Sequence, residues 1–397
     1  MLDIFHINAT MTAENLKKGD IMLIRRHYDS IIANELQPGR VLVIYGPRRA
    51  GKTTLIKNFM PVSGFKCRYE TGDDRVLCDV FKSGRLDVLT KTFADDELLI
   101  IDEAQRVPNL GHGLKILVDG LPSLRVIASG SSSFEIAGQV GEPLTGRKST
   151  LNLFPVSAGE MAATYGRIEL ERQYQDLVVY GSYPDIITAP SYTAKARALR
   201  ELTNDYLFKD IIAFEGLRNS EKVRSLLMLI ALQVGKQVSI TELGTQLGMS
   251  KLTVERYLDL LQQAFIIFKV NGFSRNLRTE ITKMSRYYFL DNGILCSLLN
   301  NYTALAQRND AGMLWENWIV GERRKKNEYE NTFMNQYFWR TYARQEIDLV
   351  EEGGGRLSAF EIKLGNKQPQ APKSWRSAYP DAEYAVINRE TFMEFVV

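Results

Sequence analysis

Short apolar runs and longer amphipathic segments divide the chain into two kinds of region. Residues 41–45 (VLVIY) and the LLII run within residues 97–106 are apolar throughout, which is typical of strands buried on both faces. Residues 124–130 (LRVIASG) form a third run of this kind. From about residue 161 onward, apolar residues recur at spacings of three and four, which is typical of helices. The pattern predicts an α/β domain followed by a helical segment.

The first apolar run leads directly into a glycine-framed loop, GPRRAGKTT, at residues 46–54. The loop matches G-x-x-x-x-G-K-[ST], the sequence of a phosphate-binding loop (P-loop), and the alternative is a chance glycine loop. In such a loop two glycines permit the turn, Lys52 neutralises the β and γ phosphates of ATP, and the Thr53 hydroxyl joins the Mg²⁺ shell. Arg48 and Arg49 are expected to face solvent or a partner. The predicted ATP-binding residues of the loop are Gly46, Pro47, Arg48, Arg49, Ala50, Gly51, Lys52, Thr53 and Thr54.

Two further strands end in polar residues that suit the same nucleotide site. The run within residues 97–106 ends in Asp102 and Glu103, and the run at 124–130 is followed by serines. We expect Asp102 to hold the Mg²⁺ and Glu103 to polarise the attacking water. Ser131 or Ser132 is the candidate sensor of the γ-phosphate. The alternatives are a solvated strand end for the acidic pair and simple turn chemistry for the serines.

Five segments in chain order resemble a prokaryotic family of AAA+-type ATPases: GPRRAGKTT, LLIIDEAQ, ASGSSSF, LTGRKSTLNLFPVSAGE and VVYGSYPDII. Members of that family carry a DUF4143-type domain after the ATPase, and the resemblance spans nearly the whole chain. It implies an ATPase that uses ATP and Mg²⁺. A Gly-Arg pair recurs in the family at the place of Gly146 and Arg147. Two interpretations of Arg147 remain open: a finger for the γ-phosphate of its own or a neighbouring subunit, or a surface salt bridge.

The middle of the chain contains a pattern typical of a winged helix-turn-helix. Ser239 or Thr241 starts a short helix, Gly248 makes the turn, and Ser250 caps a second helix. Two strands follow, IIFKV at residues 266–270 and YYFL at 287–290. The preceding helices, over residues 161–219, are expected to form a lid that folds back over the nucleotide.

Basic residues concentrate in this winged helix, which makes DNA a candidate partner. Residues 216–300 hold eleven Lys and Arg against six Asp and Glu. Such an excess favours phosphate contact. The alternative is a packing module between two domains. The predicted DNA-binding residues are Lys251, Thr253 and Arg256 near the start of the second helix, and Arg275, Arg278, Lys283 and Arg286 in a basic wing between the strands.

The last hundred residues carry a set of charged groups that suits divalent-metal phosphodiester chemistry. A helix provides Glu316, a strand pair ends near Asp348, and Glu361 and Lys363 share one face of a further strand. Asp348 and Glu361 are the candidate ligands of a second Mg²⁺. The set resembles the active site of the restriction-endonuclease-like PD-(D/E)xK fold, with spacing like that of archaeal Holliday-junction resolvases, although Ile347 stands where that fold often has proline. The alternative is a nuclease-like fold retained for binding or dimerisation.

Composition adds little to this picture but excludes some classes of protein. The net charge is only +3, and three cysteines and three histidines lie without metal-ligand spacing, so a zinc site or a disulfide framework is not expected. No window approaches about 18 uninterrupted apolar residues. We therefore expect a soluble cytoplasmic protein without a membrane partner.

The sequence thus predicts an α/β protein in four parts. The parts are a P-loop ATPase core at residues 1–160, a helical lid at 161–219, a winged helix-turn-helix at 220–300 and a nuclease-like domain at 301–397. One functional hypothesis is an ATPase that couples nucleotide state to DNA binding and DNA cleavage. The other is a regulatory switch that binds a protein partner and cuts nothing. An arginine finger acting between subunits would also require a homo-oligomer.

Overall fold

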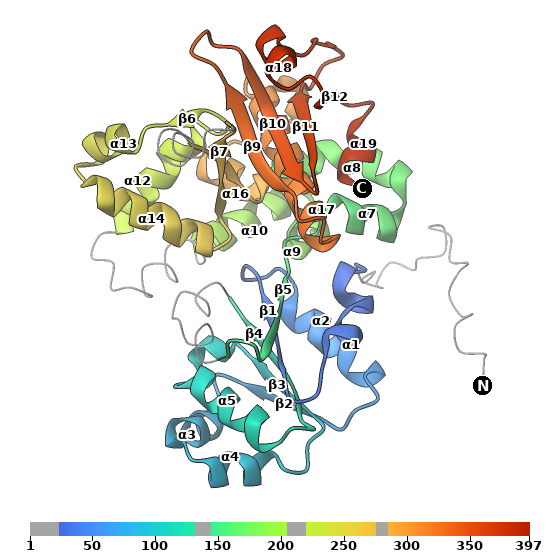
Figure 1. Ribbon diagram of the computed structural model, residues 1–397, viewed down its shortest axis with the longest axis vertical. Helices are drawn as coiled ribbons and strands as arrows, with labels where there is room; N and C mark the ends of the chain where they lie inside the picture. The colour runs from blue at the N-terminus through green and yellow to red at the C-terminus, as the bar shows by residue number, and fades with distance from the viewer. Residues whose placement is uncertain (1–23, 132–143, 205–219, 275–284) are drawn as a thin grey trace.

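The computed structural model describes residues 24–131, 144–204, 220–274 and 285–397. Two halves, each built around its own β-sheet, lie one above the other (Figure 1). The lower half contains the glycine-rich loop, and the upper half contains the rest of the chain from about residue 158 onward.

The lower half is a parallel sheet of five strands in the order β2-β3-β4-β1-β5. Every residue of β1 and β3 is buried, because their apolar side chains face helices on both sides. A mixed α/β fold with a parallel sheet is what the P-loop prediction requires. The elements are η2 (His27–Ser30), α1 (Ile32–Glu35), β1 (Val41–Tyr45), α2 (Lys52–Phe59), η3 (Met60–Val62), β2 (Cys67–Thr71), α3 (Arg75–Ser83), α4 (Leu86–Phe93), β3 (Leu98–Asp102), η4 (Ala104–Arg106), α5 (Leu110–Gly120), β4 (Arg125–Gly130) and β5 (Lys148–Asn152).

The upper half is built on a sheet of seven strands in the order β12-β11-β10-β9-β7-β8-β6. Strand β7 pairs with β9 in parallel, so the sheet runs without a break across the boundary predicted at residue 300. The elements are α7 (Ala158–Tyr165), α8 (Arg167–Tyr180), α9 (Pro184–Ile187), α10 (Tyr192–Asn204), α12 (Ser220–Ala231), β6 (Gln237–Val238), α13 (Ile240–Leu247), α14 (Lys251–Gln263), β7 (Ile267–Gly272), β8 (Ser285–Phe289), α16 (Asn292–Leu298), η6 (Leu305–Gln307), α17 (Ala311–Tyr329), β9 (Asn335–Arg340), β10 (Glu346–Gly353), β11 (Arg356–Ile362), α18 (Lys373–Ala378), β12 (Glu383–Ile387) and α19 (Phe392–Val396).

Helices α13 and α14 begin at predicted caps, and α13 ends at the predicted turn. The Ser239 side chain accepts a hydrogen bond from the Glu242 N–H, and the Ser250 side chain accepts one from the Thr253 N–H. Between the two helices, Gly248 takes the left-handed conformation that a tight turn needs. The local helix-turn-helix therefore has the expected caps, while its classification as a winged helix stays a prediction.

The helices expected to form a lid pack mainly within the upper half. Helix α8 lies against α16 and α17, and α10 lies against α16. The short α9 is close to the P-loop, since a Cβ atom on Gly51 would lie 3.9 Å from Cγ of Pro184. Whether these helices move over a bound nucleotide stays a prediction.

Helix α17 is the central element of the upper half. It lies among α8, α16, β8, β11 and α19, and its Trp315 side chain is fully buried. It also buries polar side chains, among them Asn317, Glu322, Lys325 and Asn327. Buried polar groups require hydrogen-bond partners, so each of these residues ties α17 to another segment.

Candidate functional site

The P-loop leaves the carboxyl end of β1 and turns directly into helix α2. Gly46 lies so close to the segment after β5 that a Cβ atom would come within 2.0 Å of the Leu153 carbonyl oxygen. The backbone φ of Gly46 is 155°. Only glycine fits this position, and the loop thereby keeps its backbone N–H groups near the start of α2, where phosphate binds.

The Lys52 side chain is folded into the P-loop and is only 6% exposed. Its ammonium group donates to the carbonyl oxygens of Gly46 at 2.8 Å and Pro47 at 2.9 Å. Burial lowers the pKa of Lys52 to about 8, although Glu103 and Asp102 act in the opposite direction. A bound phosphate would compensate for this burial, since it brings negative charge to the ammonium group.

Asp102 accepts hydrogen bonds from three side chains. The Thr53 hydroxyl donates to its Oδ2 at 2.6 Å, the Tyr69 hydroxyl donates to the same oxygen at 2.8 Å, and the Ser129 hydroxyl donates to Oδ1. Burial opposes ionisation of Asp102, but these hydrogen bonds outweigh it and hold its pKa below the ordinary value. A hydroxyl and an ionised carboxylate side by side are ligands that suit Mg²⁺, so the residues present fit that ion.

Glu103 follows Asp102 in a left-handed conformation with φ of 49°. The amide of Gln105 donates to Glu103 Oε2 at 2.6 Å and to the Ser131 hydroxyl at 3.3 Å. Gln105 therefore joins the predicted water-polarising residue to the predicted γ-phosphate sensor, a link that our sequence reasoning missed. The alternative sensor, Ser132, lies outside the described residues.

Arg147 lies at the wrong end of the sheet for its own nucleotide. Strand β5 starts at Lys148, which pairs with Val41 at the start of β1, whereas the P-loop follows the end of β1. A strand of five residues spans about 16 Å, at about 3.3 Å per residue. Arg147 instead forms a 2.8 Å ion pair with Asp119, and its side chain is 40% exposed. The prediction of a finger for its own phosphate is corrected in favour of the salt bridge; the role toward a neighbouring subunit stays a prediction.

Arg26 contacts the P-loop backbone, and no pattern in the sequence pointed to this role. Its guanidinium donates to the Ala50 carbonyl oxygen and, at 2.6 Å, to that of Phe154, and it pairs with Glu160 at 3.0 Å. The glutamate lies 134 positions further along the chain. Arg26 therefore links the P-loop to the segment that leads into the upper half.

The upper half brings the four predicted nuclease-like residues close together. Three of them are carboxylates, and the fourth is Lys363. The Lys363 ammonium group lies 2.7 Å from Glu361 Oε1 and 3.4 Å from Asp348 Oδ2, and the latter oxygen also accepts from the Ile362 N–H at 2.9 Å. Glu316 faces the same centre from α17, where the Tyr288 hydroxyl donates to its Oε1 at 2.8 Å. We define the carboxylate cluster as Glu316, Glu346, Asp348 and Glu361.

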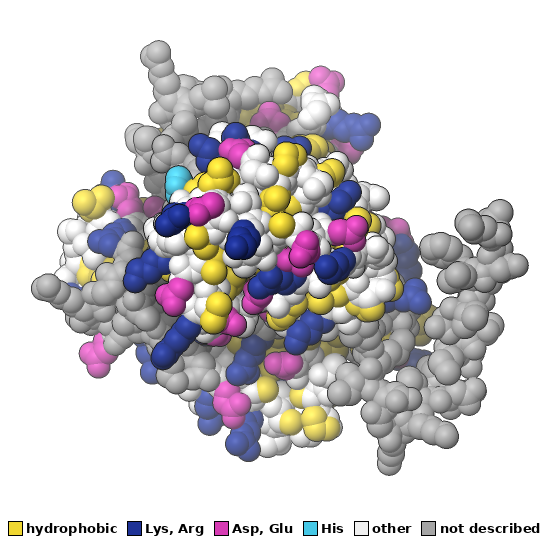
Figure 2. Space-filling view, turned by 90° about the horizontal axis from the view of Figure 1, so that it is seen from below, with side chains coloured by type: hydrophobic (Ala, Val, Ile, Leu, Met, Phe, Trp, Pro, Cys, Tyr) yellow, Lys and Arg dark blue, Asp and Glu magenta, His cyan; other side chains and the backbone are white. Residues whose placement is uncertain are grey.

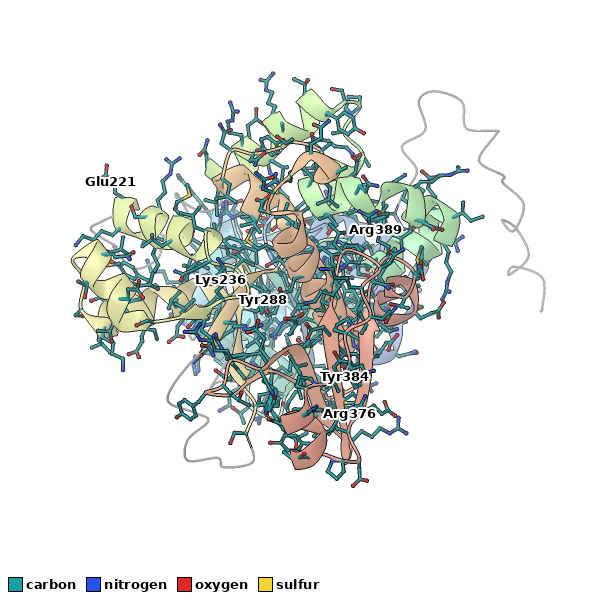
Figure 3. The ribbon with its side chains drawn as sticks, turned by 90° about the horizontal axis from the view of Figure 1, so that it is seen from above. Glu221, Lys236, Tyr288, Arg376, Tyr384 and Arg389 are labelled. Atoms are coloured by element: carbon teal, nitrogen blue, oxygen red, sulfur yellow. The ribbon has the colours of Figure 1, made fainter. Side chains whose placement is uncertain are left out.

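Two tyrosines border the carboxylate cluster, Tyr288 from β8 and Tyr384 from β12 (Figure 3). Burial and the nearby Glu361 raise the pKa of Tyr384 to about 12, and burial raises the pKa of Tyr288 well above its ordinary value. Both phenols therefore stay neutral at physiological pH, and Tyr288 donates its hydrogen bond to Glu316.

Arg286 belongs to this cluster and not to an exposed DNA-binding wing. Its side chain is 3% exposed, and its guanidinium lies 3.2 Å from Glu346 Oε2, 3.8 Å from Glu316 Oε1 and 3.9 Å from Asp348 Oδ1. The prediction that Arg286 contacts DNA is corrected, because its position on β8 directs it toward three carboxylates. The sequence correctly indicates a positive charge at this position, but it does not indicate that the side chain points into the interior.

A second Mg²⁺ does not fit the carboxylate cluster in this state. The predicted ligands Asp348 and Glu361 are already paired with Lys363, and Arg286 lies against Asp348 and Glu316. Over residues 24–131, 144–204, 220–274 and 285–397, no group of three or more His, Cys, Asp or Glu side chains is arranged to hold a metal ion.

The remaining predicted DNA-binding residues are placed only in part. Lys251 is exposed at the start of α14 and lies 3.6 Å from Glu255, and Arg256 lies one turn further along the helix. Arg275, Arg278 and Lys283 lie outside the described residues. Among the helices that the structure describes, none is long and apolar enough to cross a membrane.

Comparison with known protein families assigns three regions of the chain. Residues 38–162 match an AAA domain, residues 171–304 match a domain of unknown function, DUF8612, and residues 311–395 match another, DUF4143. The chain therefore carries an AAA domain of the P-loop ATPase type, followed by a C-terminal DUF4143 region. The resemblance noted from the sequence is confirmed.

Whole-length relatives exist but are themselves uncharacterised. An uncharacterised protein of Mycobacterium tuberculosis is 27% identical over 382 residues, which cover 95% of this chain and 82% of the relative. Another, from Methanocaldococcus jannaschii, is 22% identical over 377 residues and covers 89% and 82%. Among solved structures, a mutant of Thermotoga maritima RuvB is 18% identical and covers 58% of this chain and 81% of its own, with a TM-score of 0.28, a value too low to support an argument.

The buried Glu316 predicts a pH dependence of stability. Burial and the nearby Asp348 raise the pKa of Glu316 from 4.5 to about 8. The folded state then binds more protons than the unfolded state between these values, so this group makes stability fall as pH rises through that window. We expect Glu316→Gln to remove the effect, so that the variant gains stability relative to the wild type between about pH 4.5 and about pH 8. Urea denaturation at a series of pH values measures it.

Glu171→Gln, at an exposed position on α8, is the matched control and should show a constant difference from the wild type. A difference between Glu316→Gln and the wild type that does not change with pH would contradict the assignment.

Proposed function

We propose that this protein hydrolyses ATP with Mg²⁺ and couples its nucleotide state to DNA through the upper half. The observation that carries the ATPase proposal is the contact of Thr53 with Asp102 beside the buried Lys52. Lys52 and Thr53 lie at the start of α2, and Asp102 is the last residue of β3, so the three meet at the carboxyl edge of one parallel sheet. That is the arrangement in which a phosphate, a Mg²⁺ ion and an attacking water are held together.

Each residue has a distinct role in this proposal. Lys52 and the P-loop backbone bind the phosphates, and Thr53 and Asp102 hold the Mg²⁺, which neutralises charge on the phosphate oxygens. Glu103 orients the attacking water, and Gln105 fixes the Glu103 carboxylate relative to Ser131. Ser131 then responds to the presence of the γ-phosphate.

Coupling to the upper half follows the segment that leaves β5. The Leu153 N–H donates to the carbonyl oxygen of Tyr45, the last residue before the P-loop, at 2.7 Å. The Phe154 N–H donates to the Tyr329 hydroxyl at 3.2 Å, and the Ala158 N–H donates to Glu322 at 2.6 Å. The segment is therefore in contact with the P-loop on one side and with α17 on the other.

Helix α17 extends this connection to the carboxylate cluster. Tyr329 at its carboxyl end is near the P-loop segment, and Glu316 in its first half belongs to the cluster. Tyr329 lies thirteen positions after Glu316, a distance of about 20 Å along the helix at about 1.5 Å per residue. A helix packed along its length transmits displacement as a rigid element, so a change at the P-loop is expected to move β8 and its neighbours.

DNA binding is supported by the surface around α14. Lys251 and Leu252 are exposed at the amino end of that helix, the part of a helix-turn-helix that approaches a major groove. On the lower face of the molecule, basic and acidic side chains are intermixed with hydrophobic ones, which does not create the single-sign field that phosphate contact uses (Figure 2). The winged-helix assignment and the division at residues 160, 219 and 300 remain part of this proposal.

A second function has an observation of its own in its favour. The carboxylate cluster already contains Arg286 and Lys363, which favours a nuclease-like region that binds a partner and does not cut. In that case the protein is an ATP-dependent regulatory switch that binds a protein partner. If Arg147 also reaches the phosphate of a neighbouring subunit, the working form is a homo-oligomer.

Replacing Lys52 tests the ATPase proposal directly. Lys52→Ala should abolish ATP hydrolysis, because the γ-phosphate loses its charge partner, while the far-ultraviolet circular dichroism and the unfolding midpoint stay near those of the wild type. Phosphate release in the presence of Mg²⁺ measures turnover. Lys57→Ala, on the exposed side of the same helix, is the charge-matched control and should retain activity. Full activity in Lys52→Ala would contradict the site.

Neutralising the exposed start of α14 tests the DNA proposal. Lys251→Ala combined with Arg256→Ala should weaken DNA binding about tenfold or more and reduce the slope of log affinity against log salt by about 2, since two phosphate contacts are lost. Fluorescence anisotropy of labelled duplex DNA at several salt concentrations measures both. Lys82→Ala with Lys91→Ala, exposed in the lower half, removes the same charge as a control. Equal losses in the two double variants would show a nonspecific charge effect and contradict the interface.

A further inference from the structure

We propose that Arg286 is the resident cation of the carboxylate cluster and takes the place that a divalent metal would occupy in a nuclease centre. The inference does not depend on ATP hydrolysis. Arg286 connects β8 to α17 and β10. It therefore lies in the interior of the upper half and not on a DNA-binding surface.

The position of the Arg286 guanidinium is fixed on several sides. It lies 4.5 Å above the Phe338 ring on β9, and its terminal nitrogens face Glu316 on α17 and both Glu346 and Asp348 on β10. Its backbone lies in an inner strand, paired with Val270 of β7 and Gln237 of β6. We call Arg286 together with Glu316, Glu346 and Asp348 the arginine lock.

Each carboxylate of the cluster already has at least one oxygen that faces a cation or a hydrogen-bond donor. Glu316 Oε1 accepts from Tyr288 and faces Arg286. Asp348 Oδ1 faces Arg286, while Oδ2 accepts from the Ile362 N–H and contacts Lys363. Glu361 is paired with Lys363 at 2.7 Å. A Mg²⁺ ion requires oxygens at about 2.0–2.1 Å, so it would have to displace these donors.

The charges around the cluster also disfavour metal binding. A guanidinium within 4 Å of Glu316 and Asp348 neutralises charge that would otherwise attract a metal, and it repels a dication placed between them. Arginine does not deprotonate in proteins, so the cation of the lock keeps its charge as the pH changes. Opening it would require β8 to shift within the sheet.

The lock accounts for how a set of carboxylates can be buried without a metal. Carboxylates brought together in the interior repel one another and are destabilising unless cations or hydrogen bonds compensate them. Arg286 and Lys363 supply the cations, and Tyr288 and the Ile362 N–H supply hydrogen bonds. The amino end of β8 is thereby attached to the first half of α17.

Manganese binding to the nucleotide-free protein tests the lock. We expect the wild type to bind Mn²⁺, followed by electron paramagnetic resonance of the free ion, no more tightly than Asp348→Asn does. Arg286→Met should create a site at least tenfold tighter than any in the wild type, and Asp348→Asn in the same chain should abolish it. Arg340→Met removes a neighbouring positive charge that contacts Glu346 but neither Glu316 nor Asp348, and should create no site.

A wild-type Mn²⁺ site that Asp348→Asn abolishes would overturn the proposal, as would a folded Arg286→Met protein that gains no site. If Arg286→Met does not fold, the unfolding midpoint of Asp348→Asn, measured with a chelator present, distinguishes the lock from an empty metal site. The lock predicts that Asp348→Asn lowers the unfolding midpoint, because Arg286 and Lys363 lose a charged partner. An empty metal site predicts the opposite, because removing one of several repelling carboxylates raises the midpoint.

Discussion

The buried ion pair between Glu322 and Lys325 on α17 constrains how the two halves of the molecule are joined. These side chains are 3% and 1% exposed, and charges so deeply buried require further partners. Glu322 accepts from the Ala158 N–H, and the Lys325 ammonium group donates to the Val156 carbonyl oxygen at 3.4 Å. Both partners lie on the segment that continues from β5. Separating α17 from that segment would leave two buried charges without these partners, so the structure keeps α17 beside the edge of the P-loop sheet.

The P-loop site and the carboxylate cluster differ in how far the charge of their carboxylates is balanced by nearby cations of the protein. Asp102 is held ionised by hydroxyl donors that a metal can share, so the P-loop site is prepared for a ligand that brings positive charge. The carboxylate cluster contains its own cations, Arg286 and Lys363, and needs none from outside. This contrast explains why two sites that look alike in sequence, each with acidic residues at a strand end, support different proposals.

Local chemistry determined which parts of the fold were predictable. The apolar run at residues 41–45 and the caps Ser239 and Ser250 act over a few residues, so their strand and helices were predicted with their starts close to those observed. The pairing of Asn271 with Tyr337, which makes one sheet of two predicted domains, depends on residues far apart in the chain and had no local signal.

The same distinction between local sequence signals and long-range contacts applies to the candidate site residues. Lys52, Thr53 and Asp102 were identified because their motifs are short and each position has a chemical reason. Arg26 was missed because its partner Glu160 lies far along the chain. Arg286 was assigned to an exposed wing because a basic residue near other basic residues gives no indication of burial, and only the sheet register shows its direction.

Hydrogen exchange of the backbone amides shows whether α17 couples the P-loop to the upper half. Exchange would be compared for the protein alone and with Mg²⁺ and a non-hydrolysable ATP analogue. We expect altered protection in residues 46–54 and also in α17 and β8. Altered protection confined to the P-loop and the end of β3, with α17 and β8 unchanged, would contradict it.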